Sequence, residues 1–265
     1  MRRDKVTVPK LMEMKKSGKK ITMLTAYDYS FAEILDEAGI DVLLVGDSLG
    51  NVVLGYKNTL PVTMEDVIHH TKAVSRGVKN ALVVSDMPFM SYFSREEALR
   101  NAGRLIRAGA EAVKLEGGLA FEDKIRALTE VGIPVMGHVG LMPQSIHQMG
   151  GYKVQGKTPE GMKKILDDAK AVEGAGAFSI VLEGIPSDMA KKITEELKIL
   201  TIGIGAGAHC DGQVLVTHDL LGFYDSTSKF VKRYANLRKV ILEASRKYKE
   251  DVEEGAFPTD RYGYS

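Results

Sequence analysis

The sequence predicts one (β/α)8 barrel, or TIM barrel, over residues 1–265, with a short helix near the N-terminus. Two observations support this α/β fold class. Eight short apolar runs alternate with helical segments over the length of one domain. Most of these runs also end in a polar side chain, and in a barrel the carboxyl ends of all strands share the face where active sites are built.

The predicted elements follow one another with short connections. The N-terminal helix is expected over residues 9–20. The expected strands lie at 21–25, 42–46, 81–84, 112–118, 133–137, 178–182, 200–204 and 213–217. Helices are expected at 29–38, 63–76, 95–108, 121–131, 159–173 and 187–197. Gly39 and Gly109 follow two of these helices, as is typical of helix ends. Residues 251–265 lack periodicity and are expected to form an irregular C-terminal tail.

A doubly wound dinucleotide-binding sheet is the rival fold. The segment Gly203-Ile204-Gly205-Ala206-Gly207 resembles part of a dinucleotide-binding turn. It lies late in the chain, however, and lacks both the third glycine of that motif and a clear ribose-binding acid about 20 residues later. We therefore interpret these glycines as a tight turn between a strand and a helix.

Composition narrows the class of partner and the compartment. The chain has a formal net charge of +1 and no long basic run, so neither nucleic acid nor an acidic membrane surface is an expected partner. No apolar run approaches the roughly 18 residues of a membrane span, and the N-terminus lacks the apolar core of a signal peptide. The single cysteine, Cys210, excludes an internal disulfide and suits a reducing cytosol. We expect a cytoplasmic protein that acts on a small molecule.

Two charged residues interrupt the apolar segment 112–118, AVKLEGG. Because side chains alternate along a strand, Lys114 and Glu116 are predicted to share one face. A buried charge costs several kcal/mol unless it is paired, hydrogen-bonded or bound to a metal. The pattern therefore indicates a functional site, although a structural Lys–Glu ion pair would satisfy it equally well.

Polar residues at the ends of five predicted strands are expected to meet at the mouth of the barrel. They are Asp47, Ser48, Asp86, Lys114, Glu116, His138 and Glu183. Any one of them could instead cap a helix, which is the strongest alternative for Asp47, Ser48 and Asp86. Convergence of so many polar residues is harder to explain in that way, so we favour a shared site.

Three of these residues, Asp47, Asp86 and Glu116, are carboxylates with no cysteine and one histidine nearby. Oxygen-only ligand sets suit Mg²⁺ better than Zn²⁺, which favours nitrogen and sulfur. The histidines without a defensible metal-ligand spacing are His69, His70, His147, His209 and His218. Cys210 is interpreted as a spectator. The residues thus predict a divalent-metal barrel enzyme for a small anionic substrate, with Lys114 as the countercharge.

Five short segments occur in an order that is typical of one enzyme family. They are MLTAYD at 23–28, VGDSLG at 45–50, VKLEGG at 113–118, GHVGLMPQ at 137–144 and GIGAG at 203–207. Together they strongly resemble the ketopantoate hydroxymethyltransferase family, also called 3-methyl-2-oxobutanoate hydroxymethyltransferase. The resemblance extends from about residue 6 to residue 248, and no departure occurs at a position that matters.

The resemblance implies an enzyme of pantothenate and coenzyme A synthesis that depends on Mg²⁺. It would make ketopantoate (2-dehydropantoate) from α-ketoisovalerate (3-methyl-2-oxobutanoate) and 5,10-methylenetetrahydrofolate through a Mg-stabilised enolate. Carried over by motif, Asp47, Asp86 and Glu116 would be the metal residues. Ser48, Asp86 and Lys114 would contact the substrate. The resemblance also implies a homo-decamer of two stacked pentamers.

The same resemblance implies that Glu183 is the general base. Its place at the end of the sixth apolar run predicts a carboxylate across the barrel from the metal acids, where partial burial would raise its pKa. The alternative is a structural carboxylate that caps the next helix or pairs with a lysine. His138 is the competing base and is interpreted as a hydrogen-bond partner of product or a proton relay.

Further alternatives concern a loop and the reaction class. The glycines at 149–156 suggest a lid that excludes water, and a plain connecting loop would have the same composition. A Mg-dependent carbon–carbon lyase or mutase would share the acids but would not use folate. A non-catalytic assembly subunit is the alternative of another class, and intact acids at the strand ends count against it.

Overall fold

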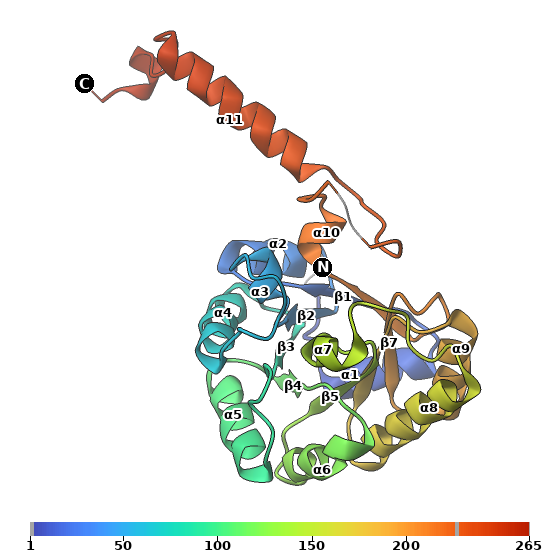
Figure 1. The fold of residues 1–265 in the computed structure, drawn as a ribbon. Helices are drawn as coiled ribbons and strands as arrows, with labels where there is room; N and C mark the ends of the chain where they lie inside the picture. Colours follow the sequence, from blue (N-terminus) through green and yellow to red (C-terminus); the bar gives the residue numbers. More distant parts are fainter. Residues whose placement is uncertain (1–2, 226–227, 265) are drawn as a thin grey trace. The chain divides into compact units, whose positions relative to one another are not determined.

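Eight parallel strands close into a barrel in the computed structural model, which describes residues 3–225 and 228–264 (Figure 1). The strands are β1 Ile21–Thr25, β2 Val42–Val45, β3 Leu82–Asp86, β4 Ala112–Lys114, β5 Val135–Gly140, β6 Ser179–Glu183, β7 Leu200–Ile204 and β8 Gly212–Leu215. Each pairs with the next along the chain, and Ile21 opposite Gly212 begins the β1–β8 ladder that closes the ring. The predicted (β/α)8 barrel is confirmed.

Helices alternate with the strands from β1 to β7, and further helices follow β8 along the chain. The α-helices are α1 Val8–Lys16, α2 Tyr29–Glu37, α3 Leu49–Val52, α4 Met64–Gly77, α5 Arg95–Arg107, α6 Glu122–Glu130, α7 Ile146–Met149, α8 Pro159–Gly174, α9 Ser187–Glu196, α10 Thr217–Leu220 and α11 Leu237–Glu253. The 3-10 helices are η1 Leu119–Phe121, η2 Pro143–Ser145 and η3 Asp260–Tyr262. Side-chain caps begin many of them, because the first amide groups of a helix lack internal partners. Thr63, for example, forms a capping box with Asp66 at the start of α4.

Two strand boundaries differ from the prediction in a way that matters for the site. The predicted strand 112–118 ends at Lys114, so Glu116 lies in the following loop. Gly117 there has a φ of +124°, which an extended strand does not accommodate. β5 continues to Gly140 instead of ending at residue 137, because its last residues pair with the end of β6. His138 is therefore a strand residue.

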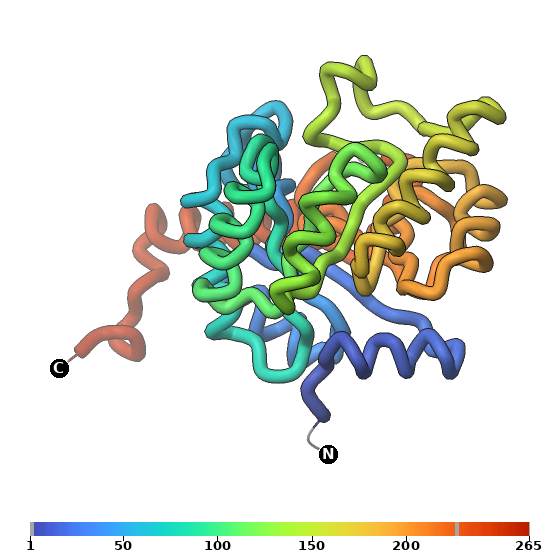
Figure 2. Tube along the Cα trace, turned by 90° about the horizontal axis from the view of Figure 1, so that it is seen from below, coloured from blue at the N-terminus to red at the C-terminus, as the bar shows by residue number. Residues whose placement is uncertain are grey.

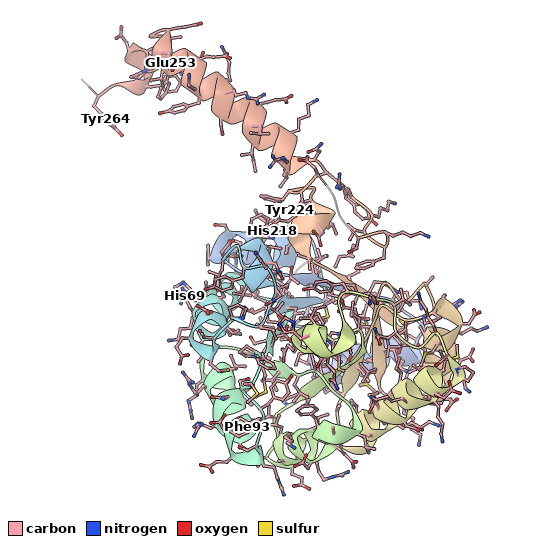
Figure 3. All side chains as sticks on the ribbon, in the orientation of Figure 1. His69, Phe93, His218, Tyr224, Glu253 and Tyr264 are labelled. Atoms are coloured by element: carbon pink, nitrogen blue, oxygen red, sulfur yellow. The ribbon has the colours of Figure 1, made fainter. Side chains whose placement is uncertain are left out.

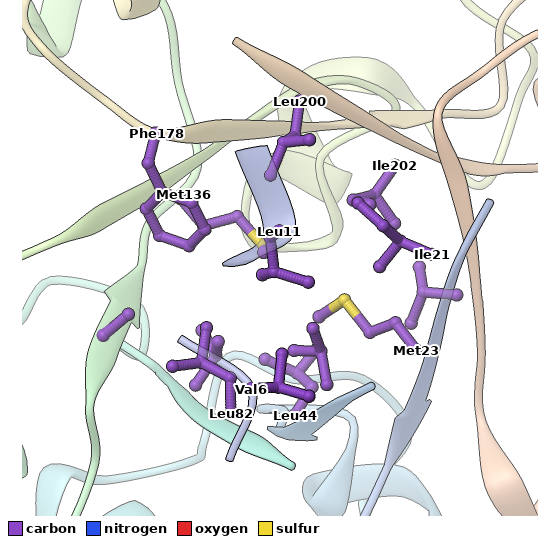
Figure 4. Packing of buried hydrophobic residues seen from close by; sticks show 14 of the residues in the cluster. Val6, Leu11, Ile21, Met23, Leu44, Leu82, Met136, Phe178, Leu200 and Ile202 are labelled. Atoms are coloured by element: carbon purple, nitrogen blue, oxygen red, sulfur yellow. The ribbon is translucent and has the colours of Figure 1, made fainter. Parts of the chain in front are cut away.

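The N-terminal helix closes one end of the barrel. Val6, Leu11 and Met14 are buried in one hydrophobic cluster with side chains from the strands. Figure 4 shows Leu11 inside the ring of strand side chains, and Figure 2 shows the dark blue helix α1 at the end opposite to the yellow-green segment after β5. Burying a side chain of this size contributes about 1.5–3 kcal/mol. The loops at the carboxyl ends of the strands are left to form the other face.

Contacts divide the chain into two compact units, Met1–Val216 and Thr217–Ser265. The barrel lies in the first unit. In the second, the expected irregular tail 251–265 differs from the structure, because residues 251–253 continue α11 and η3 follows. Ion pairs between Lys247 and Asp251 and between Lys249 and Glu253 support this last helical turn. Among the described residues, no helix has the length and apolar character needed to cross a membrane.

Candidate active site

A buried ion pair lies at the carboxyl ends of β3 and β4. The Lys114 ammonium donates to Oδ1 of Asp86 across 2.5 Å, and both side chains are almost fully buried. The two residues are opposite one another in the strand register, which brings their side chains together. The structural Lys–Glu pair considered above is therefore not formed, since Lys114 pairs with the acid of the neighbouring strand.

Asp47 follows β2 and lies beside Asp86. The backbone amide of Asp47 donates to Oδ2 of Asp86 at 3.0 Å, so both oxygens of the Asp86 carboxylate accept hydrogen bonds. A Cβ at position 46 would lie 2.8 Å from Oγ of Ser48, so glycine there allows the Ser48 side chain to approach the turn closely. The Ser48 hydroxyl is 2.8 Å from the hydroxyl of Tyr27, a residue in the loop after β1, and the two groups form a hydrogen bond.

His138 lies between two carboxylates. Its Nε2 is 3.3 Å from Oε2 of Glu183, and its Nδ1 is 3.6 Å from Oε1 of Glu116. Neither ring nitrogen makes a well-aligned hydrogen bond, although both are buried. His138 and Glu116 are almost fully buried, whereas the Glu183 side chain keeps 16% of its surface exposed. Glu183 is thus the acid of this group that retains access to solvent or a ligand.

The electrostatics of this cluster are set by burial and by repulsion between its acids. Burial and the charge of Asp86 raise the pKa of Asp47 to about 7. Burial and the charge of Asp47 also raise the pKa of Glu116 well above its usual value. Burial lowers the pKa of Lys114, but the charges of Asp86, Glu116 and Asp47 outweigh this effect and leave it raised. Burial and the charge of Lys114 lower the pKa of His138.

The alternative that Ser48, Asp86 and Glu183 cap the helices after their strands is wrong. Ser48 stands at the start of α3, but its side chain makes no capping hydrogen bond. The helix after β3 is capped by Ser94 rather than by Asp86. The residue at the cap position of α9 is Pro186, so Glu183 does not cap that helix. These three side chains therefore do not cap the helices that follow their strands.

The donor chemistry of the cluster fits Mg²⁺. The part of the chain that the structure describes has no group of three or more His, Cys, Asp or Glu side chains arranged to hold a metal ion. Mg²⁺ is commonly held by one or two carboxylates together with water and substrate oxygens, so it does not require such a group. Asp47, Asp86 and Glu116 outnumber the cation of Lys114, and a divalent ion would relieve the repulsion that helps to raise the pKa values of Asp47 and Glu116.

Two buried residues of the cluster were missed by sequence reasoning. The side-chain amide of Gln144 contacts Asp47, and the hydroxyl of Tyr92 contacts Gln144. Gln144 ends the segment GHVGLMPQ, which was a signal of the family but assigned no role to this residue. Nothing in the sequence signals Tyr92, because it lies in a loop between β3 and α5 and reaches the site only through the fold.

Tyr152, His69 and His218 lie outside the cluster of buried polar residues. Tyr152, in the segment 149–156, is more than half exposed, yet its pKa is raised by partial burial and by the charges of Asp47 and Glu183. His69 projects from the outside of α4 and is exposed (Figure 3). His218 packs against Phe223 in the second unit, with ring centres 4.7 Å apart.

Curated relatives match nearly the whole chain. A relative from Syntrophomonas wolfei, named 3-methyl-2-oxobutanoate hydroxymethyltransferase, is 58% identical over 264 residues, which are 98% of this chain and 96% of that protein. A relative of the same name from Syntrophus aciditrophicus is 58% identical over 263 residues, covering 98% of this chain and 97% of the relative.

Solved structures with low sequence identity share the fold. A phosphonopyruvate hydrolase in complex with oxalate and Mg²⁺ superposes with a TM-score of 0.63 at 14% identity, covering 97% of this chain and 91% of that chain. A 2,3-dimethylmalate lyase gives 0.62 at 17% identity, with the same coverages. The family model described as ketopantoate hydroxymethyltransferase matches residues 5–260. The predicted family is thus confirmed: this chain belongs to the ketopantoate hydroxymethyltransferases.

Proposed function

We propose that this enzyme transfers a hydroxymethyl unit from 5,10-methylenetetrahydrofolate to 3-methyl-2-oxobutanoate and so makes 2-dehydropantoate for pantothenate and coenzyme A synthesis. The observation that carries the proposal is the buried group of carboxylates around Lys114 at the strand ends of a chain from this family. An α-keto acid presents a carboxylate and a keto oxygen, which complement a cation and a metal site.

The reaction breaks the C3–H bond of the keto acid and forms a bond between C3 and the one-carbon unit of the folate. Water supplies the oxygen of the new hydroxyl group, and tetrahydrofolate leaves. The protein must therefore bind the keto acid, remove a proton from C3 and present that carbon to the folate. It must also keep bulk water from the reacting carbon.

Lys114, Asp86 and Ser48 would bind the keto acid. The charge of Lys114 is maintained in a buried setting by the neighbouring acids, so its ammonium can donate to a carboxylate that enters the mouth. Ser48 has a hydroxyl beside Tyr27 and is only partly buried, which allows it to meet a ligand. These contacts would orient C3 towards the opposite side of the barrel.

Asp47, Asp86 and Glu116 would hold Mg²⁺, in keeping with the oxygen chemistry of the cluster. When bound, the ion would polarise the keto oxygen and stabilise the negative charge of the enolate that deprotonation produces.

Glu183 would remove the proton from C3. It is the least buried acid of the group, and its position at the end of β6 lies across the barrel from β2 and β3. His138 is 3.3 Å from it and has a lowered pKa, so the neutral imidazole can take up and pass on the proton that Glu183 receives. Tyr152 and the segment 149–156 would cover the keto acid as a lid.

The assembly and the location are proposed on the family resemblance alone. We infer a homo-decamer of two pentamers in the cytoplasm. Sedimentation equilibrium of the purified protein would test the assembly, and a mass that corresponds to a monomer or a dimer would contradict it.

The function is tested by product formation with each component withheld in turn. The purified enzyme with 3-methyl-2-oxobutanoate, methylenetetrahydrofolate and Mg²⁺ should form 2-dehydropantoate, detected by mass spectrometry. Omission of the folate or of Mg²⁺ should stop it. Consumption of the keto acid without folate, with a cleaved or rearranged product, would favour a lyase or mutase instead.

A further inference from the structure

We propose that Gln144 is a positioning residue that holds the Asp47 and Glu116 carboxylates in place, and that Tyr92 fixes the orientation of the Gln144 amide. The inference deepens the proposed function and rests on it, because these two carboxylates belong to the site assigned to Mg²⁺. Neither Gln144 nor Tyr92 need touch the substrate.

The amide nitrogen of Gln144 uses both of its protons inside the protein. Nε2 donates to Oδ2 of Asp47 at 2.9 Å and to the backbone carbonyl of Met87 at 3.0 Å. Gln144 and Asp47 are each 5% exposed, and Met87 is fully buried. Oδ1 of Asp47 accepts no hydrogen bond from the described residues, so the amide occupies one carboxylate oxygen and leaves the other for a ligand.

Tyr92 contacts the other end of this amide. Its hydroxyl donates to Oε1 of Gln144 at 2.6 Å. If the amide were rotated by half a turn, Oε1 would face the carboxylate of Asp47 and the carbonyl of Met87, and no proton would lie between these acceptors. These two acceptors therefore direct the NH₂ group at Asp47, and the hydrogen bond from Tyr92 holds Oε1 on the opposite side.

Gln144 also holds the second carboxylate through its backbone. Its amide N–H donates to Oε2 of Glu116 at 3.0 Å. Pro143 starts the 3-10 helix η2 that contains Gln144, which restricts the backbone at this point. The Tyr92 hydroxyl lies 3.3 Å from both the backbone nitrogen and the backbone oxygen of Glu116. Gln144 thus connects Asp47, which follows β2, with Glu116, which follows β4. Tyr92 contacts both Gln144 and Glu116.

This arrangement matters because the two acids repel one another when both are ionised. Without fixed donors, each carboxylate would be free to rotate away from the other. Residues that orient metal-binding carboxylates typically change metal affinity or activity by about 10–100-fold when they are replaced.

The test combines two conservative replacements and their double variant. Gln144→Met keeps the length of the side chain and removes its polar atoms, and Tyr92→Phe removes one hydroxyl. Mg²⁺ affinity is measured by calorimetry without substrate, and exchange of the C3 proton of the keto acid is followed in D₂O. Gln144→Met should weaken Mg²⁺ binding by about 10-fold or more. Tyr92→Phe should weaken it by about 2- to 10-fold.

The double variant tests whether Tyr92 acts through Gln144. If it does, Tyr92→Phe should have no further effect on Mg²⁺ affinity in the Gln144→Met background. Effects that multiply would overturn this part of the proposal. If Gln144→Met does not fold, Tyr92→Phe alone decides, and wild-type values of both Mg²⁺ affinity and C3 exchange in that variant would overturn the positioning role.

Ser179→Ala is the matched control. Ser179 is the first residue of β6 and lies at the other end of this strand from Glu183. Its buried hydroxyl donates to the backbone carbonyl of Leu200. The control should lower the melting temperature and leave Mg²⁺ affinity unchanged. A similar loss of Mg²⁺ affinity in the control would show that any buried hydrogen bond has this effect, and would overturn the proposal.

The failure of this inference and the failure of the proposed function give different results. Wild-type enzyme that forms 2-dehydropantoate, with unchanged Mg²⁺ affinity and exchange in folded Gln144→Met, would refute the positioning role only. Weakened Mg²⁺ binding in the variants of a wild-type protein that makes no 2-dehydropantoate would refute the proposed function and support the positioning role. A wild-type protein that binds no Mg²⁺ would refute the positioning role together with the metal assignment.

Discussion

The two ends of the barrel are built from the same strands but bury opposite kinds of side chain. At the amino-terminal end, Leu11 and its neighbours from α1 fill the barrel with apolar groups. At the carboxyl-terminal end, Asp47, Asp86, Lys114 and Glu116 are buried almost as deeply. The first end gains free energy from burial, whereas the second loses free energy by desolvating charges that repel one another. The difference shows that depth of burial alone does not indicate a contribution to stability.

The largest expected effect concerns catalysis at the carboxyl-terminal end. Glu183→Gln should slow exchange of the C3 proton of 3-methyl-2-oxobutanoate by about 10²–10⁴-fold, because it removes the proposed general base. NMR in D₂O with Mg²⁺ and without folate measures the exchange. Folding should be unaffected and the keto acid should still bind, since Glu183 is the most exposed acid of the group. A variant that exchanges as fast as wild type would move the base to another residue.

At the opposite end, Leu11→Ala should act on stability and not on chemistry. The side chain is 1% exposed within the hydrophobic cluster, so its truncation should lower the free energy of unfolding by about 2–5 kcal/mol. Urea denaturation measures this loss, and kcat/KM is measured well below the melting temperature. A clear fall in kcat/KM while the variant is fully folded would mean that packing at the amino-terminal end also affects catalysis at the carboxyl-terminal end.

The acids predict how stability depends on pH in the absence of metal. The pKa of Asp47 is about 7 in the folded protein and 3.8 when unperturbed, so the folded state binds more protons between these values. Stability should therefore fall as pH rises from about 4 to about 7, by at most roughly 4 kcal/mol from this group.

This pH dependence also separates the two ends. Asp47→Asn should reduce the slope of stability against pH. Mg²⁺ should reduce it as well, because in the proposed site the ion would take the place of the proton on Asp47. Leu11→Ala should lower stability equally across this range and leave the slope unchanged. Denaturation curves at several pH values, with and without Mg²⁺, give the comparison. A metal-free wild type whose stability rises between pH 4 and 7 would contradict the raised pKa.

The smallest effect is expected for Ser48→Ala. If Ser48 contacts the keto acid, its loss should raise KM for that substrate by about 2- to 10-fold, which is the contribution of one hydrogen bond. Tyr27→Phe is the control, because it removes the hydroxyl that contacts Ser48 and retains Ser48 itself. Steady-state kinetics distinguish the two. Equal KM values in wild type and Ser48→Ala would exclude the contact.

The sequence by itself determined the barrel and the set of acids at its mouth. Alternating apolar runs and helices are local patterns, and a parallel barrel places every carboxyl end on one face, so the convergence of Asp47, Asp86 and His138 could be inferred from chain order. The boundaries of β4 and β5 were less accurate, because strand ends depend on pairing with neighbouring strands. Helix α11 was not predicted, since its residues are mostly polar and form ion pairs with i,i+4 spacing.

Only the tertiary structure decided how the charges are paired. Lys114 could pair with Glu116 two residues away, but strand alternation and register bring it against Asp86, which lies 28 residues earlier. Gln144 reaches Asp47 across 97 residues, and Tyr92 joins them from a loop without any recognisable motif. Periodicity predicts which face of an element a side chain occupies. Which partner it meets depends on the register of neighbouring strands and the path of the loops, which are set by packing of the whole chain.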